Sequence, residues 1–256
     1  MPLATEFDVD IVIPVYNEGV NILGTLESLK RELQFRGRVL ICYDHDDDDT
    51  LTALARYSPA PLVLTTVRNR RRGVIGAVLT GFEETTAPCV IVMPADDDYN
   101  APWLNEMIRQ HRLGYDIVAA SRFMPGGRMV GGPPLKVTLV RLAAWFMHHV
   151  ARVPTHDASN GFRLFSRRVI ERIPIESDRG FAYSIEYLVK AHRLGWPIVE
   201  VPVHWYERKA GQSRFRIFGW MAVYMKWLLF ALGTTYAGRG PASVKLKVTE
   251  VACEPR

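Results

Sequence analysis

Two clusters of aspartate follow apolar runs in this chain, and they are the residues best suited to chemistry. Residues 44–49 (Asp-His-Asp-Asp-Asp-Asp) follow the run 39–43, and Asp96, Asp97 and Asp98 follow the run 89–93. Crowded carboxylates raise the free energy of the folded state unless a cation or hydrogen-bond donors compensate them. Hard oxygen ligands spaced as on Asp96 and Asp98 can reach one divalent ion, Mg²⁺ or Mn²⁺. The second cluster therefore predicts a metal site, whereas the first is also compatible with a solvated acidic loop.

These clusters need a scaffold that brings strand ends together, and the hydropathy pattern predicts one. Strand-like apolar runs at residues 9–14, 39–43, 61–67, 89–93 and 116–120 alternate with helical spacing at 19–33, 51–57, 73–82 and 103–113. Such alternation is typical of an α/β fold with a mostly parallel sheet and helices on both faces. Ligands of these sheets bind beyond the carboxyl ends of the strands. We therefore expect both aspartate clusters at that edge.

The second half of the chain is less regular. Glycine and proline at 126–134 predict a loop, followed by a helix at 136–150, a strand at 162–165 and helices near Arg168 and at 181–194. Residues 198–205 are strand-like, and Pro202, which lacks an N–H, predicts an edge position. Residues 217–232 are almost wholly apolar. The pattern indicates one domain with a C-terminal appendage.

Composition narrows the class of protein. The 256 residues are 48% hydrophobic, which argues against disorder, and the formal net charge of +5 suits an anionic partner. Aromatic residues are not interleaved with Lys and Arg, so we expect no nucleic acid partner. Cys42 and Cys89 lie in apolar runs and are expected to be buried thiols. Residues 1–10 lack an apolar signal-peptide core, so a cytoplasmic protein is expected.

Several motifs occur in an order that resembles a known family. They are residues 13–18 (Ile-Pro-Val-Tyr-Asn-Glu), Asp44 with the acidic turn to Thr50, Arg68 with Gly73, Gly76, Ala77 and Gly81, Asp96–Asp98, Ser121-Arg122-Phe123 with Gly126-Gly127, residues 157–162, Glu186, and residues 208–214. The series resembles the family 2 inverting glycosyltransferases, and its later members resemble the dolichyl- and polyprenyl-phosphate sugar synthases. Pro94 stands where that subfamily usually has its first aspartate.

The resemblance implies an enzyme, a metal-dependent hexosyltransferase of GT-A-like fold. It would move a sugar from a UDP- or GDP-linked donor to a polyprenyl or dolichyl phosphate at a membrane surface, with Mg²⁺ or Mn²⁺ as cofactor. The chain then divides into a GT-A-like catalytic domain at 1–210, a basic loop and membrane-interface helix at 211–236, and a tail at 237–256. A hydroxyl acceptor and a non-catalytic nucleotide-binding protein of the same fold are the alternatives.

The same resemblance and the chemistry of phosphate transfer suggest the site residues. Those for the nucleotide-sugar are Pro14, Tyr16, Asn17, Glu18, Asp44, Arg68, Gly73, Asp96 and Asp97, and the metal ligands are Asp96 and Asp98. Those for the acceptor phosphate are Arg122, Lys136, Arg141, Arg208, Ser213 and Arg214, because arginine suits bidentate phosphate contacts. The catalytic set is Asp96, Asp98, Asp157, Arg122 and Arg208, with Asp157 the candidate general base for a hydroxyl acceptor.

Some of these residues have simpler interpretations. Asn17 and Glu18 precede a predicted helix, where capping alone would explain them. Each arginine could be an ordinary solvated side chain. His148, His149 and His156 are expected to be structural or surface residues rather than ligands.

The apolar segment 217–232 is expected to lie in a membrane interface. Its 16 residues span about 24 Å as a helix, less than the roughly 30 Å of a bilayer core, and it contains Lys226. Trp220, Tyr224 and Trp227 share one helical face and are residue types enriched at the headgroup level. Arg208, Lys209, Arg214 and Arg216 precede the segment and would attract anionic lipid. The alternative is a buried core helix.

Overall fold

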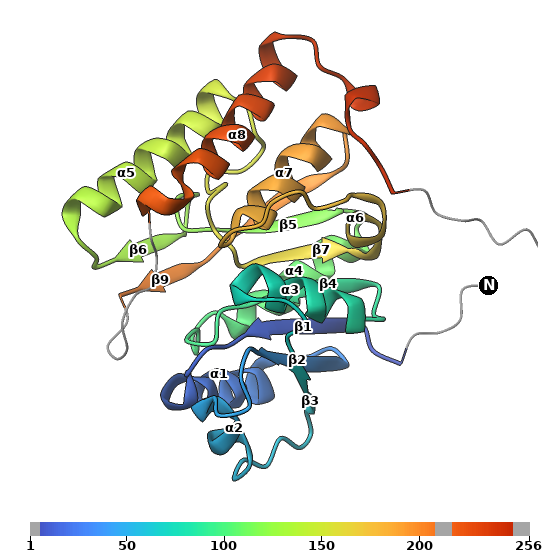
Figure 1. Ribbon diagram of the computed structural model, residues 1–256, viewed down its shortest axis with the longest axis vertical. Coiled ribbons are helices and arrows are strands. Elements are labelled where there is room, and N and C mark those ends of the chain that lie inside the picture. The colour runs from blue at the N-terminus through green and yellow to red at the C-terminus, as the bar shows by residue number, and fades with distance from the viewer. Residues whose placement is uncertain (1–5, 208–216, 248–256) are drawn as a thin grey trace, which may run out of the picture.

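The computed structural model describes residues 6–207 and 217–247, and it is built around a seven-stranded sheet (Figure 1). The strand order is β3-β2-β1-β4-β7-β5-β8. The strands are β1 (Val9–Pro14), β2 (Gly37–Tyr43), β3 (Val63–Arg68), β4 (Cys89–Val92), β5 (Ile117–Ser121), β7 (Arg163–Ser166) and β8 (Ile198–Pro202). Only β7 runs antiparallel to its neighbours, β4 and β5. The predicted α/β fold with a mostly parallel sheet is confirmed.

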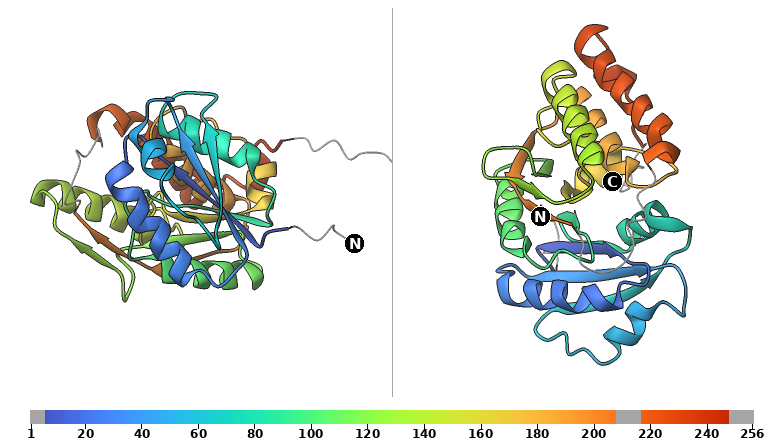
Figure 2. Two further views of the ribbon diagram at one scale, coloured as in Figure 1. Left: turned by 90° about the horizontal axis from the view of Figure 1, so that it is seen from below. Right: turned by 90° about the vertical axis from the view of Figure 1, so that its left-hand side faces the viewer.

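Helices cover both faces of this sheet (Figure 2). They are α1 (Gly19–Glu32), α2 (Asp49–Leu54), α3 (Gly73–Glu84), α4 (Ala101–Arg112), α5 (Pro134–Trp145), α6 (Arg167–Arg172), α7 (Ala182–Arg193) and α8 (Ile217–Tyr236), with a π turn at Phe146–Val150 and a 3₁₀ turn at Pro241–Ser243. Along β1, Ile11 and Ile13 belong to the core under α1 and α4, whereas Val12 belongs to the core under α3 and α7. Both faces of the strand are therefore buried, which is why residues 11–13 are apolar without alternation.

The predicted strand 198–205 is divided into two in the structure. β8 pairs with β5 at the edge of the main sheet, as Pro202 predicted, and Val203 separates it from the next strand. The next three residues form β9 (His204–Tyr206), which pairs in parallel with β6 (Arg128–Val130). Sequence analysis predicted a loop where β6 lies, because three residues between glycine pairs are too short for a periodic signal.

α8 packs against α7, and this corrects the expected position of Trp227. The Trp227 side chain is only 1% exposed, and its Nε1 donates a hydrogen bond of 2.8 Å to Ser177 Oγ. The neighbouring Lys226 pairs with Glu176 at 2.9 Å. Trp227 therefore belongs to the core and not to a membrane interface, while the side chain of Trp220 is outside the described part of the structure. Among the helices of residues 6–207 and 217–247, none has both the length and the hydropathy needed to cross a bilayer.

Replacing Trp227 tests this packing. We expect Trp227→Ala to lower the free energy of unfolding by about 3–5 kcal/mol, because it removes a fully buried ring. Leu229→Ala, two positions away on a side chain that is 61% exposed, should change it by less than about 0.5 kcal/mol. Urea unfolding of both variants gives the comparison. Equal effects of the two substitutions would show that Trp227 does not anchor α8.

Candidate active site

Loops from four parallel strands meet at one edge of the sheet. β1 pairs with β2 and β4, and β2 pairs with β3, all in parallel, so their carboxyl ends point the same way. The loops that follow carry both aspartate clusters, as the sequence predicted. Backbone direction therefore places most of the expected donor-binding residues on this edge.

Hydrogen bonds to the loop after β1 explain much of the first aspartate cluster. The Asp48 carboxylate caps α2 by accepting from Thr50 N at 2.9 Å, and it also accepts from Asn17 N at 3.1 Å. Asp49 Oδ1 accepts from Gly19 N at 2.9 Å. The backbone of Asn17 is left-handed, with φ of 53°, a conformation that asparagine tolerates. Asp48 and Asp49 thus fix the shape of the loop that carries Tyr16 and Glu18.

Asp44 has different partners and faces the loop after β3. Its Oδ1 accepts from Asn69 Nδ2 at 2.6 Å, and its Oδ2 accepts from Gly73 N at 3.1 Å, at the start of α3. Sequence analysis missed Asn69, whose only signal was its position directly after β3. Next to this group, Arg68 pairs with Asp46 at 3.0 Å on the surface. The predicted donor residues Asp44, Arg68 and Gly73 are therefore neighbours.

The second cluster contains one buried aspartate between two more accessible ones. Asp97 accepts hydrogen bonds from Asn100 N at 3.0 Å and Asn100 Nδ2 at 2.8 Å, and burial raises its pKa to about 6. Asn100 Oδ1 in turn accepts from His204 N in β9 at 3.0 Å. The carboxylate of Asp97 is thus engaged in holding its loop against β9, and this argues against the donor contact expected for it.

Asp96 and Asp98 remain the candidate metal ligands. Asp96 is half-buried and Asp98 is exposed. The Asp98 carboxylate lies over α1, where Oδ2 is 3.7 Å from the position that a Cβ on Gly24 would occupy. Within the described residues, no three His, Cys, Asp or Glu side chains converge where they could hold a metal ion. Two carboxylates fit an ion that takes its other ligands from a diphosphate and water.

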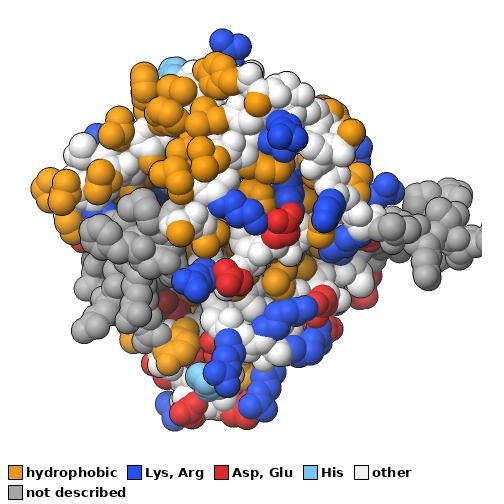
Figure 3. Space-filling model, turned by 45° about the horizontal axis from the view of Figure 1, so that its top comes forward, with side chains coloured by type: hydrophobic (Ala, Val, Ile, Leu, Met, Phe, Trp, Pro, Cys, Tyr) orange, Lys and Arg blue, Asp and Glu red, His pale blue; other side chains and the backbone are white. Residues whose placement is uncertain are grey.

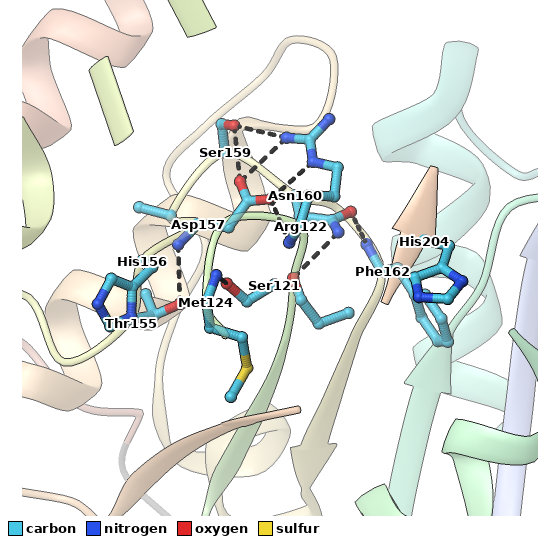
Figure 4. A network of polar contacts seen from close by, with 12 residues as sticks. Ser121, Arg122, Met124, Thr155, His156, Asp157, Ser159, Asn160, Phe162 and His204 are labelled. Atoms are coloured by element: carbon cyan, nitrogen blue, oxygen red, sulfur yellow. Dashed lines mark hydrogen bonds and ion pairs between the residues drawn. The ribbon is translucent and has the colours of Figure 1, made fainter. Parts of the chain in front are cut away.

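Asp157 forms a buried ion pair with Arg122 (Figure 4). Arg122 donates from Nε to Asp157 Oδ2 at 2.6 Å and from Nη2 to Oδ1 at 3.0 Å, and Ser159 Oγ donates to Oδ1 at 3.0 Å. Asp157 is fully buried, and Arg163 donates to its backbone carbonyl. A carboxylate held in this way has no access to an acceptor hydroxyl. This geometry argues against the expected role of Asp157 as a general base and favours a role as the counter-ion of Arg122.

Some of the other residues expected to bind the acceptor lie on α5 near a cavity, and the rest lie outside the described residues. Lys136 and Arg141 lie on α5, and a cavity of about 420 Å³ beneath that helix is lined by Arg122, Arg141, Trp145, His148, His149 and His156. The three histidines were not expected to line a site. Arg208, Ser213 and Arg214 lie outside the described residues.

Comparison with known proteins gives the family. Residues 10–174 match the model of glycosyl transferase family 2. The chain belongs to this family. It is a glycosyltransferase with the GT-A-like fold, which the resemblance in its motifs had implied.

Relatives and solved structures agree with that assignment. The chain is 26% identical over 80% of its length to polyprenol monophosphomannose synthase of Mycolicibacterium smegmatis, covering 79% of that protein. It is 27% identical over 79% of its length to undecaprenyl-phosphate mannosyltransferase of Micrococcus luteus, covering 85% of that protein. Glucosyl-3-phosphoglycerate synthase of Mycobacterium tuberculosis, solved with Mn²⁺, UDP and glucosyl-3-phosphoglycerate, superposes with a TM-score of 0.61. It is 15% identical, over 90% of this chain and 80% of that one, and so supports the fold.

The counter-ion role of Asp157 predicts a large loss of stability on substitution. Asp157→Asn leaves Arg122 buried without a negative partner, which should cost about 3–5 kcal/mol of unfolding free energy. Asp46→Asn, which breaks the exposed pair with Arg68, should cost no more than about 1 kcal/mol. Chemical denaturation measures both. An Asp157→Asn protein of wild-type stability that had lost only turnover would restore the general-base assignment.

Proposed function

We propose that this glycosyltransferase moves a sugar, with inversion, from a nucleoside-diphosphate donor to a polyprenyl or dolichyl phosphate at a membrane surface. One observation carries the proposal. The arginine-lined cavity lies under α5, and Trp145 both lines the cavity and belongs to the exposed apolar surface of that helix. A phosphate and the isoprenyl chain attached to it would therefore find adjoining sites. The names of the two relatives, polyprenol monophosphomannose synthase and undecaprenyl-phosphate mannosyltransferase, support the same acceptor.

The donor would bind at the carboxyl edge of the sheet. Pro14, Tyr16, Asn17, Glu18, Asp44, Arg68 and Gly73 are the candidates for the nucleotide and sugar. Asp44 accepts from Asn69 and Gly73 and keeps an oxygen lone pair on each carboxylate oxygen for a ring N–H of the base, uracil or guanine. Asp97 would act on this site indirectly, by fixing the loop of Asp96 and Asp98.

A divalent ion, Mg²⁺ or Mn²⁺, would be held by Asp96 and Asp98. When bound, it would supply the positive charge that stabilises the departing nucleoside diphosphate. A phosphate oxygen of the acceptor forms the new bond to the anomeric carbon on the face opposite the leaving diphosphate. An acceptor phosphate is already anionic at neutral pH and needs no general base, which agrees with the burial of Asp157. A hydroxyl acceptor would need such a base, and we therefore favour the phosphate.

The proposal is tested by transfer and by the metal ligands together. With geranyl phosphate as acceptor and UDP- and GDP-linked hexoses as donors, we expect a glycosyl phosphate product that EDTA suppresses. Asp98→Ala should reduce turnover at least about a hundredfold, since a Lewis acid contributes several kcal/mol. It should also abolish the Mn²⁺-dependent rise in melting temperature on adding UDP or GDP.

Asp178→Ala removes an exposed carboxylate elsewhere, 76% exposed, and should leave both readouts unchanged. If Asp98→Ala keeps metal-dependent turnover, the metal assignment fails. If no donor yields product with geranyl phosphate but a soluble alcohol does, the proposed acceptor is wrong.

The same proposal requires contact with a membrane, and α5 offers a suitable surface. Leu135, Leu139, Leu142 and Trp145 on α5 are all exposed, as are Met225 and Leu229 on the neighbouring α8. Figure 3 shows hydrophobic side chains gathered over this part of the molecule. Arg128 and Arg141 are exposed nearby and would attract anionic headgroups, which are abundant on the cytoplasmic face of membranes. The surface suits peripheral binding, with apolar side chains reaching the acyl boundary.

Flotation with vesicles containing phosphatidylglycerol tests this contact. The wild-type protein should float, and the Leu139→Glu/Leu142→Glu variant should lose most of its binding, because two charges would enter the apolar boundary. Leu113→Glu changes a leucine that is 74% exposed at the end of α4 and should float like the wild type. Equal flotation of all three proteins would contradict the assignment of α5.

A further inference from the structure

The cavity under α5 contains three histidines that the proposed chemistry does not yet use. His148 and His149 come from the π turn after α5, and His156 comes from the loop that leads to Asp157. The rings of His148 and His156 stack with centroids 3.8 Å apart, and those of His148 and His149 meet edge to face at 4.7 Å. All three line the same cavity as Arg122 and Arg141.

Hydrogen bonds fix which nitrogen of the stacked rings is available to a ligand. His148 Nδ1 lies 3.1 Å from the carbonyl oxygen of Val153, and His156 Nδ1 lies 2.5 Å from Glu200 Oε1. A carbonyl and a carboxylate only accept, so Nδ1 carries hydrogen in both rings. Each Nε2 atom therefore carries a lone pair and accepts hydrogen bonds when its ring is neutral, and it donates a hydrogen bond when its ring is protonated.

The charges around the cavity are mostly compensated when the histidines are neutral. The charged and titratable groups are Arg122 (end of β5), Arg141 (α5), His148 and His149 (π turn), His156 and Asp157 (following loop), Glu200 (β8) and Tyr224 (α8). Asp157 neutralises Arg122, and burial raises the pKa of Tyr224 to about 12, which keeps that phenol neutral. Glu200 can balance one protonated ring, that of His156. Arg141 has no salt-bridge partner within the described chain and gives the cavity its permanent positive charge.

We propose that His148, His149 and His156 form the proton-dependent wall of a phosphomonoester site, which takes the phosphate of the acceptor. This inference rests on the proposed function. Protonating both stacked rings puts like charges within about 4 Å, which is unfavourable without a counter-charge beyond Glu200. A bound phosphate supplies that charge and accepts hydrogen bonds from Nε2. Anion binding and proton uptake are then linked, and each strengthens the other.

The test compares phosphate binding at two pH values. We would titrate geranyl phosphate into the full chain by calorimetry at pH 6 and pH 8, without donor. Geranyl phosphate itself titrates near pH 6, but this contribution is common to all variants and cancels in the comparison. We expect the affinity at pH 6, divided by the affinity at pH 8, to be about ten times larger for the wild type than for the His148→Asn/His156→Asn variant. Asparagine keeps a donor near the Nδ1 position and removes Nε2.

Two further variants separate the histidine effect from loss of structure. His111→Asn changes a histidine on α4 whose Nδ1 also contacts a backbone carbonyl, that of Tyr115 at 3.1 Å, outside the cavity. It should keep the wild-type pH dependence. Arg141→Gln removes a charge that does not titrate, so it should weaken binding by a similar factor at both pH values. Repeating the titration in buffers of different ionisation enthalpy should reveal net proton uptake in the wild type that the double variant lacks.

The outcomes distinguish the ligand and the two proposals. Competition of inorganic phosphate with geranyl phosphate shows whether the headgroup alone is recognised or the lipid chain is also required, and either result keeps the site. If UDP rather than geranyl phosphate shows the histidine-dependent pH effect, the cavity serves the donor and the inference is overturned. Equal pH dependence in wild type and double variant also overturns it, while leaving sugar transfer intact. Absence of transfer to geranyl phosphate with any donor, despite histidine-dependent binding, contradicts the proposed function instead.

Discussion

Two opposite charges leave water at a tolerable free-energy cost only when they do so together, and Asp157 and Arg122 satisfy this condition where β5 ends. The pair is bidentate, and its remaining hydrogen bonds go to Ser159 and to the backbone of Arg122. It joins the loop after β5 to the loop before β7, and it holds Arg122 in the wall of the cavity under α5. The proposed acceptor chemistry depends on this pair, because it engages the carboxylate of Asp157 and holds Arg122 in place.

Hydrogen-bond donors compensate the crowded negative charge of the first aspartate cluster. The backbone N–H groups of Asn17 and Thr50 donate to the carboxylate of Asp48, and that of Gly19 donates to the carboxylate of Asp49. Asp44 is bound by a side-chain amide and one backbone N–H. In the second cluster, Asn100 donates to the buried carboxylate of Asp97. Asp96 and Asp98 are the more accessible carboxylates of that cluster, which is why they are the candidate ligands of a cation.

The sequence predicted features that depend on position along a strand better than features that depend on side-chain direction. The parallel sheet and the edge that carries both aspartate clusters follow from continuous apolar runs, whose meaning does not depend on the neighbouring segments. Whether Asp97 points inward or outward is decided by Asn100 and His204, and the latter is far away in the sequence. Trp227 has the same ambiguity, because a ring suited to a lipid interface is equally suited to pack against α7. His148, which stacks on His156, lies in a π turn, and no periodic pattern in the sequence predicts such a turn.

The position of β7 has a consequence for how the chain is made. This strand, residues 163–166, lies between β4 and β5, which were both synthesised earlier. Until β7 emerges from the ribosome, β4 has one unpaired edge, and its four residues are all buried in the finished protein. An apolar strand with an open edge is a template for association with other chains. During synthesis the central sheet can therefore associate with other chains until β7 has paired with β4. A chain released before residue 166 would keep that edge open.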